Sequence, residues 1–369
     1  MKKKVAVLGA TGSIGSSALD VIRVFKDDFE PVLFTANKNR AALDVLALEF
    51  PGVKTVLGSG GLEEAIKNCG ADIFVHGIAG SAGLGASLAA LETGAKLALA
   101  NKESVVMAWH LIQNASKKHN AMIIPVDSEH SAVFNLINAH CKNEAPAEII
   151  LTASGGPFRR LSAAELERVT LKDALAHPTW NMGVKITIDS ATLANKGLEV
   201  IEAARLFSMP AEKISVTVHP QSIVHSLIRV SSGGIYAELS MPDMRLPLHN
   251  ALFFPEKRLC PFARLDFDAP QEAPLTLGFE KPDMERFPML KLAYYALRAG
   301  MSYSIVYNAA NEAAVALFCE AKIPFTRIHE VVEDALMLDW QEAPTLEAVL
   351  DVDKKAREHA FLFAKTRAN

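Results

Sequence analysis

The sequence lacks the features that would place the protein in a membrane or on nucleic acid. Its net charge is only −4 over 369 residues, so no basic excess points to nucleic acid or an anionic membrane. No apolar run approaches the length of a membrane span. The basic start MKKK is followed by only four apolar residues before Gly9, which is too few for a signal peptide. We therefore expect a cytoplasmic protein with no nucleic-acid and no membrane partner.

Cysteine is scarce, with four residues that lie far apart and share no paired spacing: Cys69, Cys141, Cys260 and Cys319. This pattern favours neither a zinc site nor a disulfide framework, and it predicts buried structural thiols. Half of the residues are apolar and 22% are charged, the profile of a globular protein. A chain of this length predicts two or three domains.

The first motif is a strand, a glycine turn and a helix. The β-type run at residues 5–8 leads into GATGSIG, residues 9–15, and then into a pattern with Ala18, Val21, Ile22 and Phe25 on one helical face. Glycines let the backbone approach a pyrophosphate, and the helix N-terminus offers free N–H groups. The spacing is Gly-x-x-Gly-x-x-Gly, so a plain tight turn is the alternative to the dinucleotide site that this context favours.

The end of the second strand indicates which dinucleotide is bound. An NAD-preferring site usually has an acid here to accept from the ribose 2′-hydroxyl, but the run at residues 31–35 is followed by ANKNR. Lys38, Asn39 and Arg40 suit a 2′-phosphate, although a solvated basic turn would look the same. The sequence therefore favours NADP over NAD.

Alternating strands and helices continue through the first half of the chain. Strand-like runs at residues 53–57, 73–75, 96–100 and 122–126 are separated by helical stretches at 84–92 and 105–117. The alternation predicts an α/β fold with a doubly wound, Rossmann-like parallel sheet, whose ligands lie beyond the C-terminal strand ends. Polar clusters follow three such ends: NKES at 101–104, DSEHS at 127–131 and TASGGPF at 152–158. A row of helix caps would also occupy these places.

Two acids stand close together in PVDSEHSAVF, residues 125–134. In an extended segment Asp127 and Glu129 would point to the same side, where two carboxylates repel unless a cation separates them. The alternative is that Asp127 or Ser128 caps a helix that begins near His130.

Further polar residues gather downstream. Trp180 and Met182 lie in HPTWNMG, residues 177–183, which resembles a mobile flap. The next stretch, KITIDSATLANKGLEV, should run from a strand into a helix that begins near Asn195. There Glu199 could complete a site for Mg²⁺ or Mn²⁺ with the two earlier acids. Hydroxyl, amide and ammonium donors suited to a phosphate monoester follow the same motifs: Ser154, Ser190, Asn195 and Lys196. A solvated helix start is the alternative for the last two.

Seven motifs in this order and spacing resemble the 1-deoxy-D-xylulose 5-phosphate reductoisomerase family: GATGSIG, NKES, VDSEH, SGGPF, HPTWNMG, DSATLANKGLE and HPQSIVHS. The resemblance covers the whole chain. It implies a homodimeric enzyme that uses NADPH and Mg²⁺, Mn²⁺ or Co²⁺ to convert 1-deoxy-D-xylulose 5-phosphate, a sugar phosphate, to 2-C-methyl-D-erythritol 4-phosphate in non-mevalonate isoprenoid synthesis.

The resemblance also implies roles for individual residues. Asp127, Glu129 and Glu199 would bind the metal and, with Lys102, form the catalytic group. The implied substrate contacts are Lys102, Ser128, Glu129, Ser154, His177, Trp180, Ser190, Asn195, Lys196 and Glu199. The implied cofactor contacts are Thr11, Gly12, Ser13, Ile14, Asn37, Lys38, Asn39, Asn101, Glu103 and Gly183. The family often has glycine where this chain has Asn37, whose side chain either adds a donor to the ribose phosphate or crowds it.

The domain organisation follows from these motifs and from composition. We expect an NADPH-binding domain at 1–127, an α/β catalytic domain with the flap at 128–262, a proline-rich linker at 263–282 and a C-terminal helical bundle at 283–369. Apolar stripes at Leu290, Ala293, Tyr294 and Leu297 and at Val306, Ala310, Ala313, Ala314 and Leu317 support the bundle, with further helices near 326–338 and 345–365.

Two other functions compete with this interpretation. A semialdehyde dehydrogenase usually needs a nucleophilic cysteine, and none of the four cysteines lies in a polar cluster. A non-catalytic NADPH-sensing protein would keep the glycine turn but would not need three converging carboxylates.

Overall fold

The structure is a computed structural model that describes residues 1–141, 144–180, 182–268 and 275–366. The chain divides into two compact units. Unit 1 consists of Met1–Ser104, Trp109–Phe134 and Asp243–Arg264, and unit 2 of Val105–Ala108, Asn135–Pro242 and Leu265–Asn369. Among the described residues no helix is long and apolar enough to cross a membrane.

Unit 1 is built on a six-stranded parallel sheet, as the sequence predicted. Its strands are β1 (Lys3–Leu8), β2 (Phe29–Ala36), β3 (Lys54–Leu57), β4 (Ile73–His76), β5 (Lys96–Leu99) and β6 (Ile123–Pro125). They lie in the order β3-β2-β1-β4-β5-β6, the doubly wound order of dinucleotide-binding sheets. The helices that belong to the unit wholly or in part are α1 (Ser13–Val24), α2 (Arg40–Glu49), α3 (Leu62–Asn68), α4 (Leu84–Glu92), α5 (Lys102–His119), α6 (Ser128–His140) and α11 (Arg245–Phe253), with a 3-10 turn at Ser81–Gly83.

The glycine turn joins β1 to α1 in a way that other residues would not permit. Gly9 has φ 83°, a left-handed conformation. A Cβ on Gly15 would lie 2.3 Å from the Gly9 carbonyl oxygen, so α1 packs directly on the turn. The backbone N–H of Gly9 donates to the Thr35 hydroxyl on β2 at 2.9 Å, which fixes the turn between the two strands.

Helix α11 enters the core of unit 1 from a distant part of the sequence. Leu248, Leu252 and Phe253 are buried in the same cluster as Phe29, and the Phe253 ring lies 5.0 Å from the Phe29 ring. Residues 243–264 therefore complete the core of the six-stranded sheet, although the expected domain at 128–262 contains most of them. The four-part division of the chain stays a prediction.

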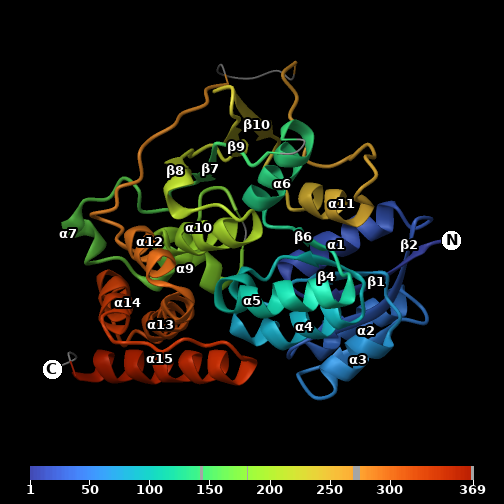
Figure 1. Ribbon diagram of the computed structural model, residues 1–369, viewed down its shortest axis with the longest axis horizontal. Coiled ribbons are helices and arrows are strands. Elements are labelled where there is room, and N and C mark those ends of the chain that lie inside the picture. The colour runs from blue at the N-terminus through green and yellow to red at the C-terminus, as the bar shows by residue number, and fades with distance from the viewer. Residues whose placement is uncertain (142–143, 181, 269–274, 367–369) are drawn as a thin grey trace. The chain divides into compact units, whose positions relative to one another are not determined.

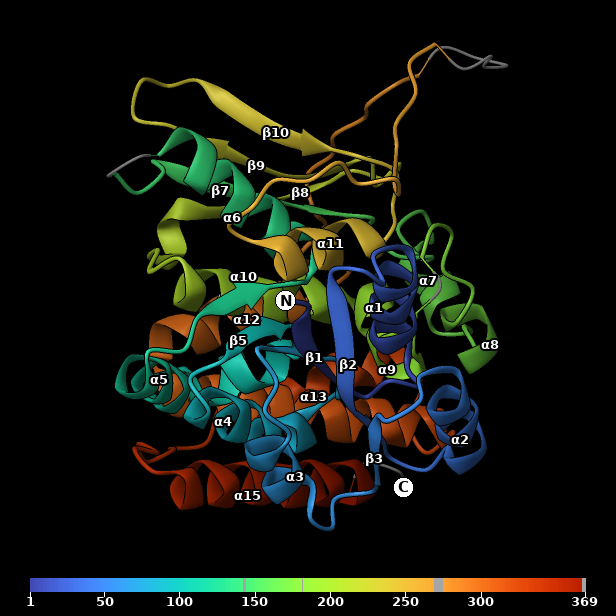
Figure 2. The ribbon, with the colours of Figure 1, turned by 90° about the vertical axis from the view of Figure 1, so that its right-hand side faces the viewer.

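Unit 2 contains a mixed four-stranded sheet in the order β10-β9-β7-β8. Its strands are β7 (Glu148–Ala153), β8 (Ile214–Val218), β9 (Val224–Arg229) and β10 (Ile235–Leu239). β8 pairs with β7 in parallel, whereas β9 is antiparallel to both β7 and β10 (Figure 2). The parallel β7–β8 connection carries four helices: α7 (Ala163–Leu166), α8 (Leu171–Ala174), α9 (Val184–Thr192) and α10 (Ala194–Leu206), with a 3-10 turn at Ala211–Lys213.

A helical bundle ends the chain, as the apolar stripes predicted. It comprises α12 (Met289–Ala299), α13 (Met301–Cys319), α14 (Ile328–Leu336) and α15 (Leu346–Thr366), with a 3-10 turn at Phe325–Arg327 (Figure 1). Leu290 and Ala293 are fully buried on α12, and Val306, Ala310 and Ala314 on α13. In the expected linker, residues 263–268 and 275–282 form no helix or strand apart from a bridge between Val218 and Glu280, and 269–274 lie outside the described residues.

Two local expectations were wrong. The strand expected at the start of KITIDSATLANKGLEV is helix α9, although its alternating isoleucines and threonine resemble a strand. In this helix the Thr187 hydroxyl donates to the Gly183 carbonyl one turn earlier at 2.9 Å, so its polar group is satisfied within α9. The four cysteines are free thiols, as expected, but each is partly exposed and none is fully buried.

Candidate functional site

The first expected cofactor contacts lie at the N-terminus of α1. Gly12 is the N-cap of this helix and provides no side-chain acceptor, so no side-chain cap covers the first N–H groups of α1. Thr11 and Ile14 are partly buried, whereas Gly12 and Ser13 are exposed. The helix start therefore presents donors and a partial positive charge where the predicted pyrophosphate would bind.

The residues expected at a ribose phosphate all lie exposed after β2. Asn37, Lys38, Asn39 and Arg40 occupy the turn between β2 and α2. The Asn39 side chain caps α2 by accepting from the Ala42 N–H at 3.1 Å. The Arg40 guanidinium lies 3.5 Å from Asp44 in a largely exposed pair, which holds it weakly. The two cations are thus accessible, and Asn39 has a structural role as well.

Asn101 fixes the loop after β4. Its amide donates to the carbonyl oxygens of Ile78 and Gly80 at 2.8 and 2.9 Å and to Glu103 at 3.2 Å, and its oxygen accepts from the Ser104 N–H at 3.1 Å. Asn101 and Glu103 are both buried. Both polar atoms of the Asn101 side chain bond protein groups, so in the structure Asn101 caps α5 and fixes the loop that follows β4.

Asp127 lies beside Lys102 and His130, just after β6. The Lys102 ammonium is 2.7 Å from its carboxylate, and His130 Nδ1 is 3.4 Å away. Burial alone would raise the pKa of the Asp127 carboxyl, but the charge of Lys102 and the His130 contact hold that pKa well below its usual range. Asp127 is therefore ionised at neutral pH, as a metal ligand must be.

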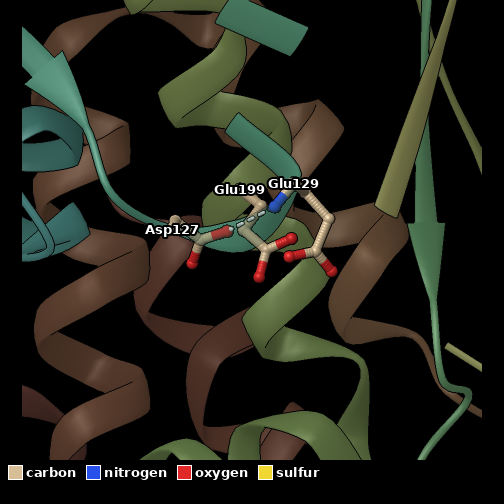
Figure 3. A group of neighbouring side chains, drawn as sticks. All are labelled: Asp127, Glu129 and Glu199. Carbon is tan, nitrogen blue, oxygen red and sulfur yellow. Dashed lines mark hydrogen bonds between the residues drawn. The ribbon is translucent and has the colours of Figure 1, made fainter. Parts of the chain in front are cut away.

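Asp127 and Glu129 converge for a different reason from the one that the sequence suggested. Glu129 lies in the first turn of α6, not in an extended segment, and its backbone N–H donates to the Asp127 carboxylate at 3.3 Å (Figure 3). Asp127 thus caps α6, so the cap alternative is confirmed. The Ser128 hydroxyl donates to Glu129 at 2.6 Å, which leaves the Asp127 and Glu129 carboxylates beside each other at the helix start.

In unit 2, Ser154 and His177 meet near the end of β7. His177 Nδ1 accepts from the N–H groups of Thr179 and Trp180 at 3.2 and 2.9 Å, so the proton of the neutral ring resides on Nε2. That nitrogen lies 3.0 Å from the Ser154 hydroxyl oxygen, which also accepts from the Gly156 N–H at 3.3 Å. Because both contacts reach the oxygen, the hydroxyl proton of Ser154 remains available to a ligand.

A second glycine packs this loop onto the α9–α10 corner, residues 190–196. Gly156 has φ 68°, and a Cβ there would lie 2.6 Å from the Ser190 carbonyl oxygen. No larger side chain could occupy the position without separating the two segments. Ser154 and Ser190 are therefore brought to neighbouring positions by direct backbone packing.

Asn195, Lys196 and Glu199 share one face of α10. Glu199 is fully buried, and its carboxylate accepts from the side chains of both Asn195 and Lys196. Lys196 is 3% exposed, and its ammonium compensates the buried carboxylate. The sequence predicted this clustering from the helical spacing, and the predicted helix start is confirmed within one residue.

The three predicted metal ligands form one acidic group. Asp127, Glu129 and Glu199 each offer a carboxylate oxygen, and these atoms all lie within 4.8 Å of one another (Figure 3). Carboxylate oxygens alone, with no thiolate or imidazole in the group, fit a hard cation such as Mg²⁺ or Mn²⁺.

The expected flap lies beside a residue to which the sequence gave no role. The Trp180 ring centre is 6.3 Å from that of His225, and Met182 is partly buried. His225 belongs to the HPQSIVHS motif. Its Nε2 is 2.8 Å from the Ser240 hydroxyl, and burial lowers its pKa to about 4. Gly183 is the N-cap of α9 and is exposed, so the flap leads directly into that helix.

The cysteines give no support to a thiol-based reaction. Burial raises the pKa of Cys69, Cys141, Cys260 and Cys319 alike, which disfavours the nucleophilic thiolate.

Sequence comparisons cover nearly the whole chain. The family described as 1-deoxy-D-xylulose 5-phosphate reductoisomerase matches residues 5–56 and 51–109, and its C-terminal domains match 123–207 and 239–359. Relatives named 1-deoxy-D-xylulose 5-phosphate reductoisomerase include one from Treponema denticola, 45% identical over 100% of this chain and 99% of the relative. Another, from Treponema pallidum, is 47% identical over 96% of each chain.

Solved structures agree with the sequence comparisons. A DOX-P reductoisomerase in complex with NADPH, fosmidomycin and magnesium matches with a TM-score of 0.90 at 37% identity, over 98% of both chains. The 1-deoxy-D-xylulose 5-phosphate reductoisomerase of Zymomonas mobilis in complex with NADPH matches with a TM-score of 0.88 at 40% identity, over 99% of both chains.

Proposed function

Because the chain belongs to the 1-deoxy-D-xylulose 5-phosphate reductoisomerase family, we propose that its own Asp127, Glu129 and Glu199 hold the divalent cation of that reaction. The enzyme depends on NADPH and a divalent metal, and it converts 1-deoxy-D-xylulose 5-phosphate to 2-C-methyl-D-erythritol 4-phosphate in isoprenoid biosynthesis. A bound divalent cation stabilises negative charge on the substrate oxygens during rearrangement, and NADPH supplies the reducing equivalents.

The acidic group is the observation that carries the metal assignment. Asp127 is kept ionised by Lys102, and Glu199 is buried with two donors on its oxygens. Lys102 lies against the group, where its ammonium can also meet a substrate hydroxyl or oxyanion. We assign Lys102 and Ser128 to the substrate backbone on this basis.

In this proposal, hydrogen-bond donors of unit 2 bind the substrate phosphate. Ser154 has a free hydroxyl proton, His177 orients it, and Ser190, Asn195 and Lys196 lie on the corner that packs against the Gly156 loop. Asn195 and Lys196 also donate to Glu199, which links the phosphate donors to a metal ligand. This link supports placing both ends of one small substrate here.

The cofactor would bind along the C-terminal strand ends of unit 1. The α1 N-terminus at residues 11–14 suits the pyrophosphate, and exposed Lys38, Arg40 and Asn37 suit the 2′-phosphate. Asn101 fixes the loop beyond β4, and we keep Asn101, Glu103 and the exposed Gly183, the N-cap of α9, as proposed cofactor contacts. We further propose that the enzyme is a cytoplasmic homodimer. Sedimentation analysis would test the dimeric state.

The metal assignment is tested with amide variants that keep side-chain shape. Asp127→Asn, Glu129→Gln and Glu199→Gln should each lose metal affinity by calorimetry and lower substrate-dependent NADPH oxidation by at least about a hundredfold, because each removes a charged ligand. NADPH binding should persist in all three. Asp351→Asn, which changes an exposed carboxylate paired with Lys355 on α15, is the matched control and should behave as the unaltered enzyme. Full metal affinity and turnover in Glu199→Gln would refute the assignment.

A further inference from the structure

The α9–α10 corner carries three of the proposed phosphate donors in an unfavourable backbone conformation. Leu193, between the two helices, has φ 62°, a left-handed conformation that is costly for a residue with a Cβ. Leu193 is 4% exposed. A buried leucine keeps such a conformation only where surrounding contacts impose it. The positions of Ser190 on one side and Asn195 and Lys196 on the other depend on those contacts.

One contact holds the α9 side of the corner. Asn311, on α13, donates its amide to the Asp189 carboxylate at 2.8 Å. The partners are 0% and 1% exposed, so the bond is shielded from water. Lys185 pairs with the other oxygen of Asp189 at 2.7 Å. Asp189 is the immediate neighbour of Ser190, so this bond fixes the helix turn from which Ser190 projects.

A second contact from the same helix holds the α10 side. Tyr307, one turn before Asn311 on α13, shares its hydroxyl proton between the carbonyl oxygens of Met289 and Ala194, at 3.1 and 3.4 Å. Burial raises the pKa of Tyr307 well above its usual value, so the hydroxyl stays a donor. Ala194 is the first residue of α10 and precedes Asn195. A Cβ on Gly197 would lie 2.4 Å from the Tyr307 oxygen, so a glycine is needed for this approach.

Helix α13 is itself anchored on its other side. Glu312 accepts from Asn308 at 3.1 Å and from Arg357 of α15 at 2.7 Å. Arg357 also forms a bidentate pair with Asp353, at 2.8 and 2.9 Å. Helices α9, α10, α12, α13 and α15 belong to the same unit. The C-terminal bundle therefore provides a fixed support for the corner.

We propose that Tyr307 and Asn311 are positioning residues for the substrate phosphate: together they clamp the α9–α10 corner so that Ser190, Asn195 and Lys196 face the phosphate from both sides of Leu193. The proposal rests on the phosphate subsite of the proposed function. Neither residue touches the substrate. Each acts through a backbone or side-chain bond to the neighbour of a phosphate donor.

The clamp predicts a selective loss of substrate affinity. Tyr307→Phe removes only the hydroxyl, and Asn311→Leu replaces the amide with an apolar group of similar size. Each should raise KM for 1-deoxy-D-xylulose 5-phosphate by about tenfold and weaken fosmidomycin binding similarly, because donors that are displaced by a fraction of an ångström lose most of a charge-assisted hydrogen bond. KM for NADPH should stay within about twofold. Equal losses for substrate and cofactor, or no change in either variant, would overturn the clamp.

A reversed pair separates positioning from general stability. In Asp189→Asn with Asn311→Asp the donor and the acceptor exchange sides, so the bond can form again. We expect Asp189→Asn and Asn311→Asp to raise substrate KM singly and the double variant to recover to within about threefold of the unaltered enzyme. Ser302→Ala removes a 2.5 Å bond to Gln341 from the far end of α13, and it is the stability control with unchanged KM. Additive losses in the double variant would contradict the proposal.

Ser190→Ala in the same assays distinguishes the failure of the clamp from the failure of the phosphate subsite. A raised substrate KM in Ser190→Ala but not in Tyr307→Phe or Asn311→Leu would overturn the clamp and leave the subsite standing. No effect in Ser190→Ala, Asn195→Ala and Lys196→Met would overturn the subsite and the clamp with it. If Asn311→Leu fails to fold, Tyr307→Phe decides the question, since it changes a single hydroxyl.

Discussion

Asp127 serves as a helix cap and as the proposed metal ligand at once. Its carboxylate accepts the Glu129 N–H at the start of α6 and also lies 2.7 Å from the Lys102 ammonium. The sequence presented the helix cap and the metal ligand as alternatives; the structure shows the cap, and the cap leaves room for the proposed metal ligand. Asparagine caps a helix about as well as aspartate, so Asp127→Asn should keep the cap while it removes the ligand charge. The same change removes the charge that the nearly buried Lys102 ammonium faces at 2.7 Å, so we expect some loss of stability. Activity is therefore compared at a temperature at which circular dichroism shows the variant to be fully folded.

The cofactor preference is tested at two side chains after β2. Lys38→Gln combined with Arg40→Gln should weaken NADPH binding by about tenfold or more and leave NADH binding nearly unaltered, because only NADPH carries the 2′-phosphate. Binding constants for both cofactors, measured by fluorescence titration, provide the comparison. Stability should change little, since the Arg40–Asp44 pair is largely exposed and Asn39 still caps α2. An equal loss for both cofactors would argue that the two cations act only as a solvated turn.

Among the elements, the segment that begins at His177 should respond to pH. Burial lowers the pKa of His177, so the fold favours the neutral ring, which accepts the N–H groups of Thr179 and Trp180. This contribution is fully present above the ordinary histidine pKa of about 6.5 and is lost as pH falls through that value toward the lower folded-state pKa. Protonation of Nδ1 would break both bonds and release Trp180.

The measurement is Trp180 fluorescence between about pH 8 and pH 5, with Trp109→Phe and Trp340→Phe as background. We expect a transition below about pH 6.5 in the parent. We expect none in His177→Asn, whose amide oxygen can occupy the place of Nδ1 without titrating. A transition that persists unchanged in His177→Asn would assign the effect to another group.

The sequence predicted the parallel sheet of unit 1 and the terminal bundle, because buried strands and amphipathic helices leave continuous or periodic apolar patterns. It failed at α9, whose alternating Ile186 and Ile188 resemble a strand. What stabilises the helix there is partly tertiary, since Asp189 bonds Asn311 more than a hundred residues later. The contact of His130 with the Asp127 carboxylate could have been predicted, because His130 follows Asp127 by three residues. The contacts of Tyr307 and Asn311 could not have been predicted, because only the folded arrangement brings α13 to the α9–α10 corner.

At the scale of the whole molecule, the chain leaves unit 1 and comes back to it at residues 243–264. This segment is essential to the hydrophobic core of unit 1. Leu248, Leu252 and Phe253 of α11 are at most 2% exposed in its core. Full burial of a large apolar side chain contributes about 1.5–3 kcal/mol, so the three together are comparable to the roughly 5–15 kcal/mol that stabilises a typical domain.

Residues 1–134 alone should therefore fail to show a cooperative urea transition and should bind a hydrophobic dye. Joining 243–264 to them through a flexible Gly/Ser linker should restore cooperative unfolding, measured by circular dichroism. The same joined chain with Leu248, Leu252 and Phe253 changed to Ser is the control and should not recover. A stable, cooperative 1–134 fragment would show that α11 is dispensable.

The late arrival of α11 also sets the order in which the newly made protein can mature. During translation the first six strands are made well before residues 243–264, which begin roughly 6–24 seconds later at elongation rates of about 5–20 residues per second. Throughout that interval the surface around Phe25 and Phe29, which α11 covers in the finished protein, faces water. The nascent chain thus exposes an apolar, aggregation-prone surface for several seconds. This is the stage at which we expect chaperone binding to protect the chain most.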